Sequence, residues 1–197
     1  MANIYLSPSL QEFNEYLNGG SEEYYMNLIA DAMEPYLLAN NIDFTRNRPE
    51  QTLTDVINES NSGTYDLHLA LHSNAAPENL KGELAGPDIY YFEDSEDGRR
   101  FAEILEEKIE EIYPDPELVD IIPTRTLREL RRTSAPSTLI EIAYHDNAED
   151  EQWIKNNIDI IAKAITEALA EFFEIDFTDT DDVLSVNSYI IVNDFII

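Results

Sequence analysis

A single seven-residue run, Thr138–Tyr144 (TLIEIAY), limits most strongly what this chain can fold into. It is apolar and β-branched almost throughout, which is typical of a central strand covered on both faces. Asp66–His72 places leucines at alternate positions and predicts a second strand. Further strands are expected over Ile4–Leu6, Ile42–Thr45 and Asp88–Phe92.

Helical patterns separate these strands. The spacing of apolar residues predicts a helix after Ser21 and a short one over Leu53–Asn58. Longer amphipathic helices are expected over Gly98–Ile112 and Asp150–Phe173. Pro35 should kink or shorten the first helix. Alternating strands and helices predict an α/β fold, with a single twisted, mostly parallel sheet and helices on both faces.

The chain has 197 residues, which is enough to bury one substantial core. Its composition changes abruptly after Phe173, where an acidic stretch is followed by an apolar, β-prone tail. We therefore expect one domain over 1–174 and an acidic linker with an apolar tail, of unknown role, over 175–197. Ser188–Ile197 has three interpretations, an added edge strand, the start of a second domain or an oligomer contact, and the oligomeric state is open.

Charge narrows the classes of partner. The chain has 41 acidic and 12 basic residues, a net charge of −29 at pH 7. Duplex nucleic acid and anionic membrane surfaces are bound through lysine and arginine, so neither is an expected partner. The absence of cysteine excludes disulfides, thiolate zinc sites and cysteine nucleophiles.

The sequence shows no membrane or secretion signal. No apolar run approaches the length that crosses a bilayer. The N-terminal residues MANIYLSPS lack the basic and apolar regions of a signal peptide. We therefore expect a cytoplasmic protein until its release or its export by a route other than Sec.

Glu141 is the least expected residue on physical grounds, because it lies in the middle of the apolar run. A buried carboxylate must be paired, bound to a metal or held protonated. Glu141 therefore indicates a general acid or base with a raised pKa, or else a rim glutamate paired with an arginine. His72 ends its strand where α/β sheets bind ligands, and is a metal ligand, a base or a structural histidine. His68, on the same strand face, is expected to be packed or to support a ligand.

Two charge clusters have both a functional and a structural interpretation. Glu22 and Glu23 open a helix, where acidic residues complement the helix dipole. The segment Arg125–Arg132 holds four of the twelve basic residues and lies next to the Glu141 strand. It either forms a wall that binds carboxylates or neutralises the acids around it.

Four blocks together resemble a known family. They are Ile4–Ser9 (IYLSPS), Glu22–Asn27 (EEYYMN), Leu69–Ala75 (LALHSNA) and Leu139–Asn147 (LIEIAYHDN). In order and spacing, over roughly residues 3–173, the chain is similar to the zinc-dependent N-acetylmuramoyl-L-alanine amidases often called Amidase_3, which cut peptidoglycan. Arg46, after Thr45, also resembles the family's Thr-Arg at the end of the second strand.

The resemblance implies a set of site residues. In the family, zinc is held by a histidine after the first strand, a glutamate at a helix start and a histidine of the third block, while a strand glutamate is the catalytic acid/base. The matching residues are Glu23, His72 and Glu141, since the spacing to Asn27 favours Glu23 over Glu22. The first histidine falls on Leu10, so the third protein ligand is open, with the candidates Gln11, Glu12, Asn14 and His145.

The resemblance implies a hydrolase that acts on the bacterial cell wall. Residues 1–174 would be an amidase-like catalytic domain that cleaves the amide bond between N-acetylmuramic acid and L-alanine, with the stem peptide and muramic acid as its partners. Arg128, Arg131 and Asn74 are the expected substrate-binding residues, the arginines on charge alone. The alternatives are a non-catalytic peptidoglycan-binding protein with a degraded metal site, and a metallo-amidase for another acyl amino acid.

Overall fold

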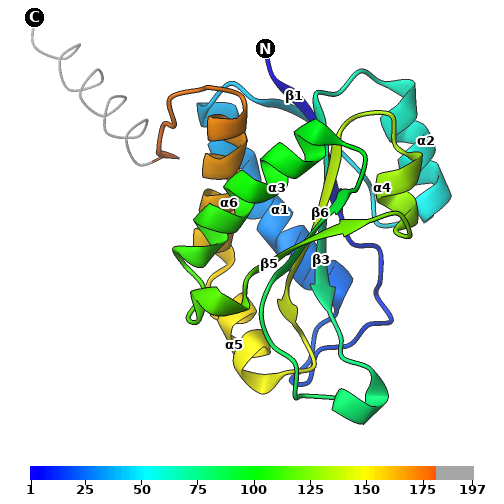
Figure 1. Cartoon of the computed structure of the whole chain (residues 1–197), viewed down its shortest axis with the longest axis vertical. Helices are drawn as coiled ribbons and strands as arrows, with labels where there is room; N and C mark the ends of the chain where they lie inside the picture. The colour runs from blue at the N-terminus through cyan, green and yellow to red at the C-terminus, as the bar shows by residue number, and fades with distance from the viewer. Residues whose placement is uncertain (181–197) are drawn as a thin grey trace, which may run out of the picture.

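The computed structural model describes residues 1–180 and contains one six-stranded sheet (Figure 1). The strand order is β2-β1-β3-β6-β4-β5. All neighbouring strands are parallel except β4 and β6, which pair antiparallel. The predicted α/β fold with a mostly parallel sheet is confirmed. The strands are β1 (Asn3–Pro8), β2 (Asp43–Arg46), β3 (Leu67–Asn74), β4 (Asp88–Phe92), β5 (Asp120–Thr124) and β6 (Ser137–Tyr144).

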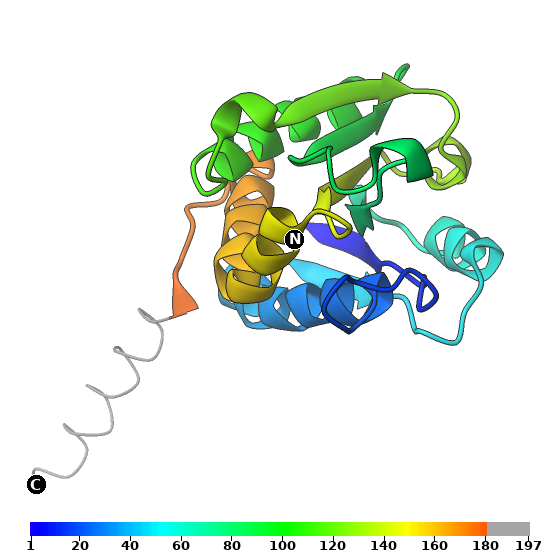
Figure 2. The same ribbon diagram turned by 90° about the horizontal axis from the view of Figure 1, so that it is seen from below.

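Helices cover both faces of the sheet, as Figure 2 shows. One face carries the main apolar core under α1 (Glu22–Ala39), α3 (Glu96–Glu110), α5 (Ala148–Asn156) and α6 (Ile158–Phe172). The other face is covered more thinly by α2 (Leu53–Ser62) and α4 (Arg128–Arg132), which pack over a small cluster. Two 3-10 turns lie at Glu78–Leu80 and Pro116–Leu118. The thinly covered face leaves room for a site.

Three local predictions differ from the structure. Pro35 lies inside an unbroken α1 on its exposed side, where water can satisfy the carbonyl that loses its hydrogen bond. The expected helix over 150–173 is divided at Asn157, which ends α5 and precedes α6. β5 is an additional strand that contains Pro123; as an edge strand paired only with β4, it tolerates a residue without an N–H.

The segment 175–180 lies against the helices of the domain. Phe177 stacks on Tyr36, and Thr178 exchanges two hydrogen bonds with the side chain of Asn40. Lys163 pairs with Asp179. The predicted tail segment Ser188–Ile197 lies outside the described residues.

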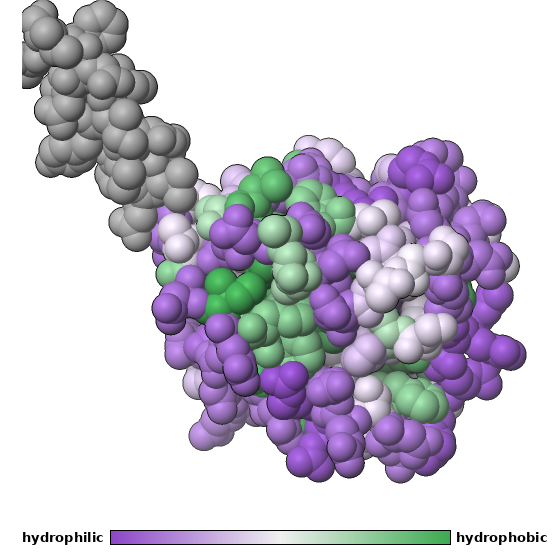
Figure 3. All heavy atoms as spheres, turned by 90° about the horizontal axis from the view of Figure 1, so that it is seen from above, coloured by the Kyte–Doolittle hydropathy of each residue, from purple (hydrophilic) through white to green (hydrophobic). Residues whose placement is uncertain are grey.

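The face drawn in Figure 3 is hydrophilic around its rim and carries a broad hydrophobic area near its middle. No helix within residues 1–180 is long and apolar enough to cross a membrane.

Candidate active site

The candidate site lies at one edge of the sheet, where β1, β3 and β6 all end. In the strand register His72 of β3 pairs with Glu141 of β6, and Glu141 pairs in turn with Asp88 of β4. Because β4 runs antiparallel to β6, its first residue reaches this same edge. Paired residues on neighbouring strands point to the same face, so these three side chains form a row across the sheet.

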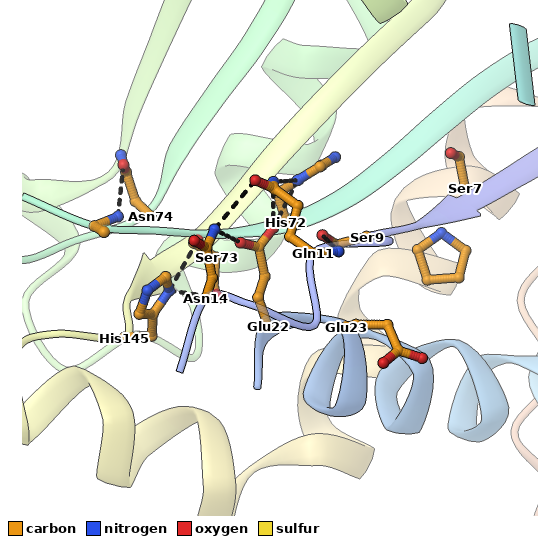
Figure 4. Close-up of polar contacts among 12 residues, drawn as sticks. Ser7, Ser9, Gln11, Asn14, Glu22, Glu23, His72, Ser73, Asn74 and His145 are labelled. Atoms are coloured by element: carbon orange, nitrogen blue, oxygen red, sulfur yellow. Dashed lines mark hydrogen bonds and ion pairs between the residues drawn. The ribbon is translucent and has the colours of Figure 1, made fainter. Parts of the chain in front are cut away.

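Glu22, the first residue of α1, faces the ring of His72. Its Oε1 lies 2.7 Å from His72 Nδ1, and the residue is only 1% exposed. Figure 4 shows Glu22 pointing toward His72 and Glu23 pointing away. Successive helical residues are rotated by about 100°, so one of the two faces the ring and the other does not. Burial favours the neutral acid, but hydrogen bonds with His72 and Asn14 outweigh it and lower the pKa of Glu22.

The prediction of Glu23 as a zinc ligand relied on its spacing to Asn27. In the structure, however, Asn27 binds Arg46. Arg46 Nη2 donates to Asn27 Oδ1 over 2.7 Å, and Arg46 also pairs with Asp31 and Glu34. Asn27 and Arg46 therefore fasten α1 to β2. The structure places Glu22, rather than Glu23, beside His72.

The loop after β1 adds two amide side chains to this pair. Gln11 Nε2 lies 3.1 Å from Glu22 Oε1 and 3.3 Å from His72 Nδ1. Asn14 Nδ2 donates to Glu22 Oε2 over 2.6 Å and to Gln11 Oε1 over 3.1 Å. Glu12, also considered as a ligand, is exposed and lines a separate hollow. Of the loop candidates, Gln11 is the one that touches both Glu22 and His72.

Glu141 is half-buried, and its Oε2 is buried without a hydrogen-bond partner. The pKa of Glu141 is raised to about 7; desolvation is the largest cause, the charge of His72 opposes it, and the charges of Glu22 and Asp88 add to it. Within residues 1–180 no arginine pairs with Glu141. The geometry therefore favours an acid/base carboxyl over a paired rim glutamate.

Asp88 was not singled out from the sequence. Its Oδ2 accepts hydrogen bonds from Asn74 Nδ2 (2.9 Å) and from the hydroxyls of Tyr144 (3.2 Å) and Tyr90 (3.4 Å). Burial raises the pKa of Asp88 in spite of these donors. Asn74, a predicted substrate-binding residue, thus lies in the site and is held there by Asp88.

Glu129 is a second residue that sequence reasoning missed. Its Oε1 accepts from Ser7 Oγ (2.6 Å) and interacts with His68 Nε2 (2.9 Å), while Ser60 Oγ meets the other ring nitrogen of His68. Glu129 Oε2 lies 3.8 Å from His72 Nε2. Burial opposes ionisation, but the two histidines hold the pKa of Glu129 well below its usual range. His68 is therefore buried and supports the site through Glu129.

The arginines of α4 do not reach this row. Arg128 donates to Thr54 Oγ1 over 2.8 Å and lines a hollow between α2 and α4. Arg125 pairs with Glu93 and Asp94, and Arg131 is exposed. The segment therefore contributes a glutamate to the site instead of a cationic wall.

His145, the remaining ligand candidate, directly follows β6 and is buried. Its Nδ1 lies 3.0 Å from the hydroxyl and from the carbonyl oxygen of Ser73. Its ring stacks on Tyr16. These contacts make His145 a packing residue.

The donor set can be tested against zinc. Within residues 1–180 no group of three His, Cys, Asp or Glu side chains is placed to hold a metal. Leu10, where the resemblance places a histidine, instead lines an apolar cavity. His72 and Glu22 are ligand types that zinc takes, whereas the Gln11 amide directs its nitrogen toward them and its oxygen toward Asn14. The described residues therefore supply two ligands that zinc usually takes, and a third, weaker one only if the Gln11 amide reorients.

Comparisons with known proteins agree on one family. The sequence pattern of the Amidase_3 family, N-acetylmuramoyl-L-alanine amidase, matches residues 12–171. A search of curated proteins finds no match to the chain.

Solved structures of amidases share the fold. An amidase from Clostridium difficile 630 is 17% identical with a TM-score of 0.78, and AmiC2 of Nostoc punctiforme is 16% identical with 0.77; each match covers 88% of this chain and 97% of the other. The catalytic domain of the CD27L endolysin, which targets Clostridia difficile, is 20% identical with a TM-score of 0.70, over 87% of this chain and 98% of that one. At these identities the likeness concerns the fold.

Proposed function

The chain belongs to the Amidase_3 family of N-acetylmuramoyl-L-alanine amidases, and from that premise we propose that it hydrolyses the amide bond between N-acetylmuramic acid and L-alanine in peptidoglycan. The observation that carries this proposal is Glu141, a carboxyl with an unpartnered buried oxygen next to His72 in the strand register. The cell wall is then its site of action.

We propose Gln11, Glu22 and His72 as the residues that hold zinc, on which this family generally depends. Bound zinc would polarise the scissile carbonyl and lower the pKa of water. The ring of His72 offers Nδ1 on the side of Glu22 and Gln11. Burial lowers the pKa of His72, but Glu129 and Glu22 outweigh it and raise the pKa, so zinc would displace a proton from Nδ1 while Glu129 holds the proton on Nε2.

Glu141 is the proposed acid/base. With a pKa of about 7, both of its forms are populated near neutral pH. The carboxyl group of Glu141 can take a proton from the attacking water and return it to the leaving nitrogen of L-alanine, while its buried Oε2 disfavours the charged form. No protein donor competes for that oxygen among the described residues.

Substrate contacts are proposed on the β4 side. Asn74 and Tyr144 both reach Asp88 Oδ2 and border the space beside Glu141. Arg128 and Arg131 stay a prediction for longer stem peptides, because they lie over α2 and α4 away from His72.

One observation favours a second candidate function, a peptidoglycan-binding protein without catalysis. Leu10 removes a strong ligand, and an amide oxygen binds zinc less well than an imidazole does. A metallo-amidase for another acyl amino acid is a third candidate, because the roles proposed for Glu141 and the zinc-holding residues concern the amide bond and do not select the acyl amino acid.

The test is a digest of purified peptidoglycan by the zinc-loaded protein. Mass spectrometry should find stem peptides with a free L-alanine amino terminus, and the Glu141→Gln protein should release none. Binding to the wall without release would favour the second candidate. Release from short N-acyl-alanine amides, with none from the wall, would favour the third.

A further inference from the structure

A cavity of about 420 Å³ opens beside His72, between the end of β1 and the start of α2. His72 lies on its border, so the cavity adjoins the reacting centre directly. Neither Glu141 nor Asp88 lines it. The cavity therefore occupies the β1 side of His72, opposite the acid/base.

The walls of this cavity are apolar. They include Leu10, Leu53, Val56 and the ring of Phe13, which is 74% exposed. Such an exposed ring, in a chain of net charge −29, gives a ligand a flat apolar platform at the cavity mouth.

The polar groups of the cavity are already engaged within the protein. Ser7 Oγ donates to Glu129, and the Gln51 amide bonds to Arg48 N and Glu59. No lysine or arginine lines the cavity, while the buried carboxylate of Glu129 does. A neutral sugar fits this lining better than a carboxylate-bearing peptide does, because its apolar ring face and its acetyl and lactyl methyls can pack on the apolar side chains and its hydroxyls can stay in water at the open mouth.

The order of the site residues across the sheet is a second, independent argument that the acyl half of the substrate extends toward this cavity. A carboxyl that protonates the leaving nitrogen must lie near it, so the amine half of the substrate extends over β6 and β4. The acyl half then extends the other way from His72, toward the cavity.

We propose that this cavity binds the acyl half of the substrate, a neutral N-acetylated sugar with its lactyl group, while the stem peptide extends across β6 and β4. This inference rests on the proposed function for its substrate. It assigns Phe13 and Leu53 as residues that determine specificity for the sugar.

The first test uses the neutral carboxamide of N-acetylmuramic acid, which needs no turnover. In a nuclear magnetic resonance titration of the full chain, the amides of Phe13 and Leu53 should shift saturably while those of Asp88 and Tyr144 do not. Shifts confined to the Asp88 side, or no saturable shift anywhere, would overturn the assignment. Because catalysis plays no part, failure of the amidase proposal would appear separately, as absent release from peptidoglycan.

The second test fills the cavity. Leu53→Trp should weaken binding of the carboxamide by about tenfold or more, and Phe13→Ala should weaken it by less. Tyr24→Ala is the matched control, since Tyr24 is also an exposed aromatic (53%) but lines a different hollow. Unchanged binding by a Leu53→Trp protein whose thermal unfolding matches the parent, or equal weakening by Tyr24→Ala, would contradict the proposal.

Discussion

Two pairs of carboxyl groups in the site differ in their burial and in their partners. Glu22 and Glu129, on either side of the His72 ring, each accept several hydrogen bonds, and the pKa of each lies below its usual value. Glu141 and Asp88, on the β6–β4 side, have raised pKa values, and one oxygen of Glu141 has no partner. Burial raises the pKa in all four cases; direct contacts with histidine rings outweigh it at Glu22 and Glu129, whereas the neutral donors to Asp88 do not.

The two pairs of carboxyl groups therefore suit different roles in the proposed reaction. The ionised carboxylates around His72 favour a cation, which is the role proposed for zinc. The raised pKa values on the other side favour a group that gains and loses a proton near neutral pH. The following substitutions would break or sharpen that division.

The largest effect is expected for Glu141→Gln, which keeps the shape of the side chain but removes the proton carrier. Hydrolysis of a muramyl peptide should fall by about 10³-fold, within the range of general acid–base catalysis. Zinc binding should be unchanged, because Glu141 is not a proposed ligand. A variant that kept more than a tenth of the rate would refute the role of Glu141.

Substitutions of the neighbouring residues Glu22 and Glu23 distinguish a zinc ligand from a glutamate that only stabilises the start of α1. Glu22→Gln should lose zinc, measured as metal per chain after gel filtration, because it removes a negative ligand beside His72. Glu23→Gln is the matched control and should keep zinc, since that side chain points away. Loss of zinc in the Glu23 variant alone would restore the interpretation from sequence spacing.

Glu129→Gln should weaken zinc affinity by about 10–100-fold, as expected when the partner of a ligating histidine is lost. Ser60→Ala, which touches only His68, should have a smaller effect. Competition with a chelator gives the affinity, and ¹⁵N shifts of the His72 ring in metal-free protein report whether Nε2 still carries the proton. If the ring protonation is unchanged, Glu129 does not act through His72.

The smallest effect is a displaced pH profile. Glu141 must be ionised to accept a proton, so kcat/KM should rise with pH through about 7. The negative charge of Asp88 raises the pKa of Glu141, so Asp88→Asn should move this limb to lower pH. A limb that stays in place, or moves upward, would show that Asp88 does not tune Glu141.

Some of these residues could be predicted from the sequence because their signal is local. The β-branched run of β6 identifies a central strand, and Glu141 is conspicuous within it. His72 likewise ends a strand of alternating leucines. The α/β class follows from the same periodicities, without any knowledge of how the strands pair.

The rest depends on contacts that no local pattern carries. Glu22 and Glu23 differ by one step of helix rotation, which only the packing of α1 decides. Glu129 lies among arginines and is buried only because α4 folds over Ser7 and His68. Asp88 joins the row only because β4 is antiparallel to β6. These tertiary contacts determine which residues form the site, but the spacing of residues along the sequence does not reveal them.

The central claim is our proposal that Gln11 serves as the third zinc ligand beside Glu22 and His72. Anomalous X-ray scattering at the zinc edge, from crystals of the zinc-loaded protein, tests it most directly. The account predicts one peak, bound by the Gln11 amide oxygen, a Glu22 carboxylate oxygen and His72 Nδ1. No peak, or a peak held by His72 Nε2 and Glu129 instead, would contradict it.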